Sequence, residues 1–211
     1  MPVLLAFGDS NTHGTLPMGG RGDLGRLAPA ERWPGVCAAA LGPDWTVIEE
    51  GLPGRTSQFD DPVMGAHMNG RTGLRIALDC HRPLDVLVIM LGTNDLKTRF
   101  QPDVARVAAG LAGLVDMALS DDTQLRHGGL RVLLVCPPPV REVGALRGEF
   151  LGAEEAVGGL ADRLERLASG RGCGFLDAGA VIEVSEVDGI HFGAEAHGAL
   201  GQAIGEAVQR L

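Results

Sequence analysis

The sequence is poor in residue patterns that bind metal ions or cross-link a chain. Its four cysteines lie far apart and form no Cys-x-x-Cys pair, so neither a zinc site nor a disulfide framework is supported. Cys37 lies in an alanine-rich segment and Cys136 closes an apolar run, which predicts a buried free thiol at both positions. We therefore expect a protein with no structural metal.

Long apolar runs and basic clusters are also lacking. No segment approaches the ~20 consecutive apolar residues that a membrane-spanning helix needs. The N-terminus has no basic region of the kind that opens a signal peptide, so we expect a cytoplasmic protein with no membrane partner. The formal net charge is -9, and the basic residues are scattered. Because such a charge repels phosphate backbones, we expect no nucleic-acid partner.

The 211 residues alternate between short apolar runs and longer segments of helical composition. Two runs, 85–91 and 131–136, are almost continuously apolar, which is typical of parallel strands covered on both faces. The pattern predicts strands over 3–7, 45–50, 85–91, 131–136 and 174–178, and helices over 30–41, 71–82, 102–119, 153–170 and 194–210. Since no linker or repeat divides the chain, residues 1–211 are predicted to form one α/β domain with a doubly wound, five-stranded parallel sheet.

Polar residues follow the predicted strands at the point where each strand ends. The carboxyl ends of parallel strands meet at one edge of a sheet, so these residues are expected to lie close together. The segments concerned are Asp9 to Asn11, "GLPGRT" from Gly51 to Thr56, "GTND" from Gly92 to Asp95 and, past a short loop after the last strand, "DGIHF" from Asp188 to Phe192.

These segments contain the groups that acyl transfer to a serine requires. The Ser10 hydroxyl becomes a nucleophile only when a base removes its proton, and a histidine such as His191 has a suitable pKa for that task. Asp188 stands three residues before His191, from where its carboxylate can orient the imidazole. The N–H groups of Ser10 and Gly54 and the side-chain amide of Asn94 are candidate donors to an oxyanion.

In this order and spacing, the blocks "FGDSN", "GLPGRT", "LGTND" and "DGIHF" resemble the SGNH (GDSL-type) hydrolases over nearly the whole chain. The further segments "ERWPGV", "VIEEGLPGRT", "IMLGTNDLK" and "VDGIHF" resemble the bacterial arylesterase/acyltransferase branch. This resemblance implies a flavodoxin-like three-layer α/β/α sandwich. It also implies the nucleophile Ser10, the base His191, the orienting acid Asp188, and an oxyanion hole of Ser10, Gly54 and Asn94. No cofactor is implied, and homo-oligomers occur in this branch.

The chain departs from the family around the nucleophile and in one distal segment. Asn11 stands where the family name expects leucine, and His13 to Thr15 replace bulky residues of the arylesterase branch. We expect a substrate pocket lined by Asn11, His13, Thr15, Thr93, Lys97 and Ile190. Of these, Lys97 could steer an anionic substrate together with Arg55, although a solvated surface position is the simpler expectation for both. The resemblance to the family is weakest over the segment 140–160, which is a candidate lid over the substrate pocket.

The leading interpretation is a serine esterase that acts on small, short-chain esters through an acyl-serine, with acyl transfer to alcohols as a further activity. A carbohydrate acetylesterase or a thioesterase of the same fold is the alternative. An aspartyl-phosphate phosphatase, with Asp9 as nucleophile, lacks an acid at Asn11, and a non-catalytic binding protein would not need Ser10 and His191. His13 is a rival base without a nearby carboxylate, and His127 and His197 are interpreted as surface or capping residues.

Overall fold

The structure, a computed structural model, describes residues 1–20 and 22–211 and contains a five-stranded parallel sheet in the order β2-β1-β3-β4-β5. All four neighbouring strand pairs are parallel. The predicted sheet is therefore confirmed, with β1 in an inner position. The strands are β1 (Val3–Gly8), β2 (Thr46–Gly51), β3 (Val86–Met90), β4 (Arg131–Cys136) and β5 (Gly174–Asp177).

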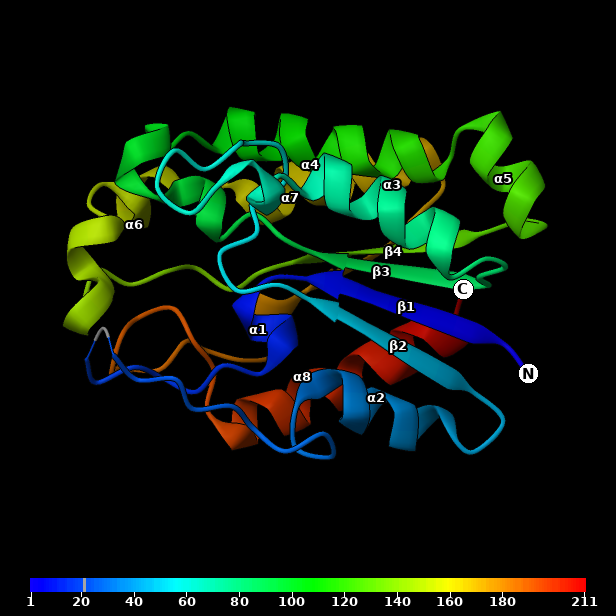
Figure 1. Cartoon of the computed structure of the whole chain (residues 1–211), viewed down its shortest axis with the longest axis horizontal. Helices are drawn as coiled ribbons and strands as arrows, with labels where there is room; N and C mark the ends of the chain where they lie inside the picture. The colour runs from blue at the N-terminus through cyan, green and yellow to red at the C-terminus, as the bar shows by residue number, and fades with distance from the viewer. Residues whose placement is uncertain (21) are drawn as a thin grey trace.

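Helices cover both faces of the sheet, which gives the three-layer sandwich (Figure 1). In Figure 1, α3, α4, α5 and α7 lie on one side of the strands, and α2 and α8 lie on the other. The α-helices are α1 (Ser10–His13), α2 (Trp33–Leu41), α3 (Gly70–Cys80), α4 (Val104–Ala118), α5 (Asp121–His127), α6 (Ala153–Ala156), α7 (Leu160–Arg171) and α8 (Ala194–Gln209). Short 3-10 helices are η1 (Ala66–Met68), η2 (Asn94–Leu96), η3 (Thr98–Phe100), η4 (Gly144–Glu149) and η5 (Ala178–Ala180).

Two apolar clusters, one on each face of the sheet, form the core. Every residue of β3 is buried, because its side chains alternate between the two clusters. On α8, Leu200, Ile204 and Val208 form an apolar stripe and are buried with residues of α2 in one cluster. Cys37 and Cys136 are buried free thiols, as predicted.

The predicted helix over 153–170 is wrong in one respect, because it is broken into α6 and α7. Gly159 has a φ of 76° and stands at the N-terminus of α7, in a left-handed conformation that no helix interior contains. Two short helices, α1 and α5, were not predicted, since four and seven residues are too few to show a helical period.

Within the described part of the chain, no helix combines the length and the apolar character needed to cross a bilayer. The carboxyl ends of β1, β2 and β3 lie at one edge of the sheet, and α1 starts there directly after β1 (Figure 1). This edge carries the polar segments identified from the sequence.

Candidate active site

Ser10 is held where β1 passes directly into α1. Asp9 caps this short helix, because its carboxylate accepts a hydrogen bond of 2.9 Å from the Asn11 N–H. Gly8 permits the tight turn: a Cβ at this position would lie 2.0 Å from the Thr12 Oγ1. The Ser10 side chain is nearly buried, yet it lines a cavity at the sheet edge.

His191 and Asp188 belong to one tight turn just before α8. The Asp188 Oδ1 accepts hydrogen bonds from the backbone N–H groups of Ile190, at 3.0 Å, and His191, at 2.9 Å. Gly189, with a φ of 72°, is required there, since a Cβ would lie 1.9 Å from the Arg141 carbonyl oxygen. The turn places the His191 Nδ1 2.6 Å from the Asp188 Oδ2.

The Asp188 carboxylate is strongly stabilised in its ionised form. Burial favours the neutral form, but hydrogen bonds from the His191 ring and from the backbone of Met18 and His191 outweigh it and lower the pKa of Asp188 to about 2. The Met18 N–H donates to the Asp188 Oδ2 at 2.7 Å. At neutral pH the carboxylate is therefore charged and accepts the proton of the His191 Nδ1, which leaves Nε2 as an acceptor.

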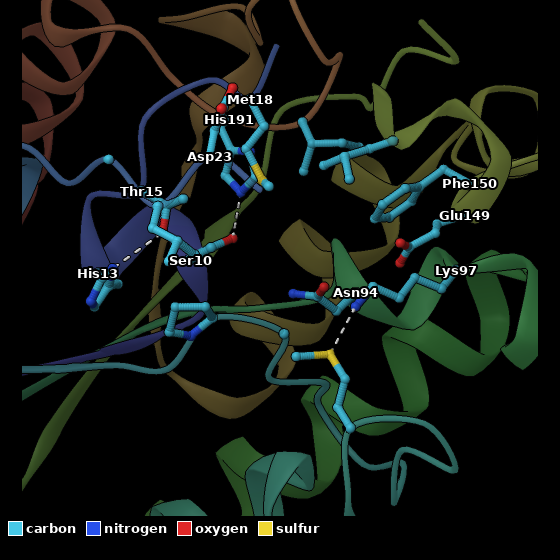
Figure 2. A pocket seen from close by; sticks show the side chains of 17 residues that line it. Ser10, His13, Thr15, Met18, Asp23, Asn94, Lys97, Glu149, Phe150 and His191 are labelled. Carbon is cyan, nitrogen blue, oxygen red and sulfur yellow. Dashed lines mark hydrogen bonds between the residues drawn. The ribbon is translucent and has the colours of Figure 1, made fainter. Parts of the chain in front are cut away.

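The second ring nitrogen of His191 faces the serine. The His191 Nε2 lies 3.0 Å from the Ser10 Oγ, as the dashed line in Figure 2 marks. Ser10, His191 and Asp188 thus form one continuous hydrogen-bonded chain, the arrangement in which a histidine can take a proton from a serine. His13, the alternative base considered from the sequence, instead pairs with a different hydroxyl: its Nδ1 lies 3.1 Å from the Thr15 Oγ1.

Three further donors lie beside the serine hydroxyl. Among the described residues, no hydrogen-bond acceptor is found for the N–H groups of Ser10 and Gly54. The Asn94 side chain donates one N–H to the Asp9 Oδ2 at 3.2 Å, which fixes the orientation of the amide. Ser10, Gly54 and Asn94 line the same cavity, so their N–H groups can bind an oxygen atom that becomes negatively charged there.

Asp95 connects the loops that carry Gly54 and Asn94. Its carboxylate accepts hydrogen bonds from the Ser57 N–H, at 2.8 Å, and the Ser57 Oγ, at 2.5 Å. Burial raises the pKa of Asp95 to about 7, although both hydrogen bonds from Ser57 oppose the shift. The sequence did not predict this contact, because nothing in "GTND" indicates a partner 38 positions away.

The cavity next to Ser10 has a volume of about 340 Å³ and most of its lining is apolar (Figure 2). Of the pocket residues predicted from the sequence, His13, Thr15, Lys97 and Ile190 line it, but Asn11 and Thr93 do not. Asn11 points into the protein, where its side-chain amide donates to the Ile190 carbonyl at 3.1 Å. Further lining residues are Met18, Asp23, Leu24, Gly25, Pro53, Met64, Leu146, Glu149 and Phe150.

Leu146, Glu149 and Phe150 come from η4 and the residue after it, so the segment 140–160 contributes one wall of the cavity. Like Met18 and Met64, these residues lie in segments without strand or α-helical periodicity. No sequence pattern could therefore have identified them as lining residues.

Several charged or polar side chains are buried, contrary to expectation. Lys97 and Arg55 are only 5% and 6% exposed, so the solvated position expected for both is wrong. The Arg55 guanidinium lies 4.2 Å from the centre of the Phe7 ring, which replaces its hydration. His127 and His197 are buried rather than at the surface, and the His197 Nδ1 accepts the N–H of Trp33, the first residue of α2, at 3.1 Å, as a capping residue does. In the described residues, no group of three or more histidine, cysteine or acidic side chains is arranged to hold a metal ion.

Comparison with known proteins gives one family and several solved structures. The model of the GDSL-like lipase/acylhydrolase family matches residues 6–199. No curated protein matches the chain.

The similar structures extend over the whole chain. An aryl esterase of M. smegmatis, in an inhibitor-bound form, is 39% identical with a TM-score of 0.94, and the match covers 100% of both chains. A carbohydrate acetylesterase from Sinorhizobium meliloti is 36% identical with a TM-score of 0.93, over 100% of this chain and 99% of that one. Both also agree with the sandwich fold described above.

Proposed function

Because this chain belongs to the GDSL-like lipase/acylhydrolase family, we propose that it is a serine esterase that hydrolyses short-chain carboxylic esters through an acyl-serine intermediate. The observation that carries this proposal is the hydrogen-bonded chain from Ser10 through His191 to Asp188, with distances of 3.0 and 2.6 Å, beside the free N–H groups of Ser10 and Gly54. Its similarity to an aryl esterase and to a carbohydrate acetylesterase supports the same reaction class.

The mechanism has two halves. In the first, the Ser10 Oγ attacks the ester carbonyl carbon while His191 Nε2 takes the serine proton, and Asp188 stabilises the imidazolium. The carbonyl oxygen becomes an oxyanion, which the N–H groups of Ser10 and Gly54 and the Asn94 amide bind. When the tetrahedral intermediate collapses, the C–O bond to the alcohol breaks, and His191 gives its proton to the leaving oxygen.

In the second half, water attacks the acyl-serine carbonyl and His191 takes a proton from that water. A second tetrahedral intermediate forms, and its collapse releases the carboxylic acid and returns the proton to the Ser10 Oγ. An alcohol in place of water would give a new ester, and this acyl transfer is part of the proposal. No step needs a cofactor.

Hydrolysis of p-nitrophenyl acetate without added metal tests the function. The wild type is expected to release p-nitrophenol, and folded Ser10→Ala is expected to lose at least about 10³-fold in kcat, as in other enzymes whose nucleophile is removed. Equal rates in the two proteins would contradict the role of Ser10. A well-folded wild type that hydrolyses no ester would leave the non-catalytic binding protein as the better interpretation.

The second candidate is a carbohydrate acetylesterase, favoured by the match to the protein from Sinorhizobium meliloti. The aryl ester is the preferred substrate class because most of the surface that lines the cavity is apolar, with Met18, Leu146 and Phe150 among its residues, while polar groups such as Asp23 and Glu149 form the smaller part. Comparing kcat/KM for phenyl acetate and for an acetylated sugar decides between them. We also propose one domain over residues 1–211 and a cytoplasmic location.

A further inference from the structure

Lys97 is the only lysine in the sequence, and it lies in the candidate active site rather than on the surface. It follows η2, directly after the turn that carries Asn94, and its N–H bonds to the Asn94 carbonyl at 3.3 Å. The residue is 5% exposed and lines the cavity. In Figure 2 its side chain lies on the Asn94 and Glu149 side, across from Ser10 and His13.

In the described part of the chain, no carboxylate forms a close ion pair with the Lys97 ammonium, although those of Glu149, Asp61 and Asp9 act on it from farther away. Its Nζ lies 3.8 Å from the Met64 sulfur, which is a weak acceptor. Among the ion pairs of the described residues, the nearby carboxylates are bound by Arg99, which lies 2.8 Å from the Asp61 Oδ2 and 3.5 Å from the Glu149 Oε2. The Lys97 ammonium therefore lies in the cavity with no close ion pair to a described residue, although Glu149 lines the same cavity.

Burying a cation without a close anion disfavours its charged form, and this effect is seen at Lys97. Burial, and next the neighbouring Arg99, lower the pKa of the Lys97 amine and outweigh the carboxylates of Glu149, Asp61 and Asp9, which raise it. An anion that entered the cavity would compensate both effects, because the desolvated ammonium would gain a charge-assisted hydrogen bond. A neutral substrate would not compensate the burial of the Lys97 ammonium.

We propose that Lys97 is the binding group for a carboxylate carried by the substrate, so that the preferred esters are small apolar esters with one anionic end. This rests on the proposed function, since it names the substrate class of the same site. The apolar walls from Met18, Phe150 and Ile190 suit the hydrocarbon part of such a substrate. Lys97 and Asn94 share one turn, so the carboxylate would be bound on the same side of the cavity as the oxyanion donor.

Matched pairs of esters test the proposal in the wild type, Lys97→Met and Arg147→Met. Mono-p-nitrophenyl glutarate is compared with p-nitrophenyl pentanoate, which places the carboxylate on the acyl side. 4-Carboxyphenyl acetate is compared with phenyl acetate, which places it on the leaving group. Methionine keeps the length of the side chain without its charge. Arg147 is an exposed cation in η4 that does not line the cavity, so its substitution matches the change in net charge.

The expected result is a ratio of kcat/KM, anionic over neutral ester, that falls by about tenfold or more in Lys97→Met for at least one pair, as for the loss of a charge-assisted hydrogen bond. In Arg147→Met the ratio should stay within about twofold of the wild type, because exposed charges contribute little. Lys97→Arg should keep part of the preference. If Lys97→Met does not fold, Lys97→Gln takes its place.

Unchanged ratios in both pairs, with Ser10-dependent hydrolysis of the neutral esters intact, would overturn the carboxylate site and leave the esterase standing. Equal losses in Lys97→Met and Arg147→Met would overturn it too, because the effect would then be one of net charge. If the wild type hydrolysed none of the four esters, the esterase proposal would fail, and the carboxylate site with it.

Discussion

The Asn94 amide uses one of its two protons on the Asp9 Oδ2, which leaves the other for a ligand in the cavity. An amide fixed in this way needs no reorganisation when charge develops on the substrate oxygen, so its contribution belongs to the transition state. The same reasoning assigns Asp9 a positioning role rather than a nucleophilic one. Asp9 is nearly buried and its carboxylate is already occupied by the Asn11 N–H and the Asn94 amide.

Asn94→Ala is expected to lower kcat for p-nitrophenyl acetate by about 10²–10³-fold with little change in KM, by analogy with other oxyanion donors. Steady-state kinetics measures this, and a thermal unfolding curve shows whether the variant is folded. A folded variant with the full wild-type kcat would remove Asn94 from the mechanism.

Asp95 gives a prediction for stability against pH. Its pKa in the folded state, about 7, is above the ordinary value of 3.8, so between these values the folded protein holds a proton that the unfolded chain has released. The protonated Asp95 carboxyl therefore stabilises the folded state fully at low pH, and this contribution is lost as the pH rises through about 7. Relative to Asp95→Asn, the wild type should lose about 1 kcal/mol of unfolding free energy per pH unit between about pH 4 and 7, and no more above it.

Urea unfolding of the wild type and Asp95→Asn at several pH values measures this difference. A difference that does not vary with pH would show that Asp95 stays ionised in the folded protein. Titrating groups that do not interact with Asp95 are common to both proteins and cancel in the comparison, whereas Asp9, which helps to raise the pKa of Asp95, does not.

At the residue scale, the sequence predicted the groups that stand at strand ends and missed those in irregular loops. Ser10 and Asn94 could be placed because parallel strands bring their carboxyl ends to one edge, whereas His191 lies past a loop after β5 and was recognised from its spacing to Asp188. Met64 and Phe150 lie in segments without periodicity, so their place in the cavity depends on tertiary packing. The burial of Lys97 was missed for another reason: a lysine in a polar segment is nearly always solvated.

At the scale of elements, strands were easier to predict than helix boundaries. The run 131–136 coincides with β4, because a strand buried on both faces has an unbroken apolar sequence. The sequence predicts one continuous helix over 153–170, but Gly158 and Gly159 lie at the break between α6 and α7. Helical composition alone does not show whether a glycine lies inside a helix or ends it.

Two glycines inside helices provide a matched test of packing against helix propensity. In α4, a Cβ at Gly110 would lie 1.9 Å from the Ser57 Oγ, the group that donates to Asp95. In α8, a Cβ at Gly198 would have no atom within 4 Å. Gly198→Ala should therefore raise the unfolding free energy by about 0.5–1 kcal/mol, as alanine does in a helix interior.

Gly110→Ala should instead lower the unfolding free energy by about 1–3 kcal/mol, as overpacking does. It should also lower kcat, because Ser57 would be displaced from the carboxylate that joins the two loops. Chemical denaturation and ester hydrolysis measure the two effects. Stabilisation by both substitutions would mean that α4 does not pack against Ser57 as described.

At the scale of the whole molecule, the cavity mouth has exposed apolar side chains. Leu24, 91% exposed, lines the cavity, and Val63, 76% exposed, precedes the lining residue Met64. Apolar side chains grouped at a site often mark a contact surface. We propose that the chain forms a homo-oligomer through this rim, which would narrow the mouth and favour small esters.

Light scattering after size-exclusion chromatography is expected to give a mass that is a multiple of the 22.0-kDa chain. Val63→Asp should shift the mass toward that of one chain, because a buried charge in the contact would be unpaired. A wild type that stays monomeric at every concentration would contradict the oligomer and leave the chemistry of the site unaffected.

The proposed reaction depends on the Ser10 Oγ as a nucleophile activated by His191. Reaction with phenylmethylsulfonyl fluoride, a serine-directed reagent, followed by mass spectrometry of the protein and of its peptides, tests this role. One adduct per chain is expected, located on Ser10, formed in step with the loss of ester hydrolysis and absent from Ser10→Ala. Complete loss of hydrolysis with Ser10 unmodified, or modification of Ser10 with hydrolysis intact, would contradict this role.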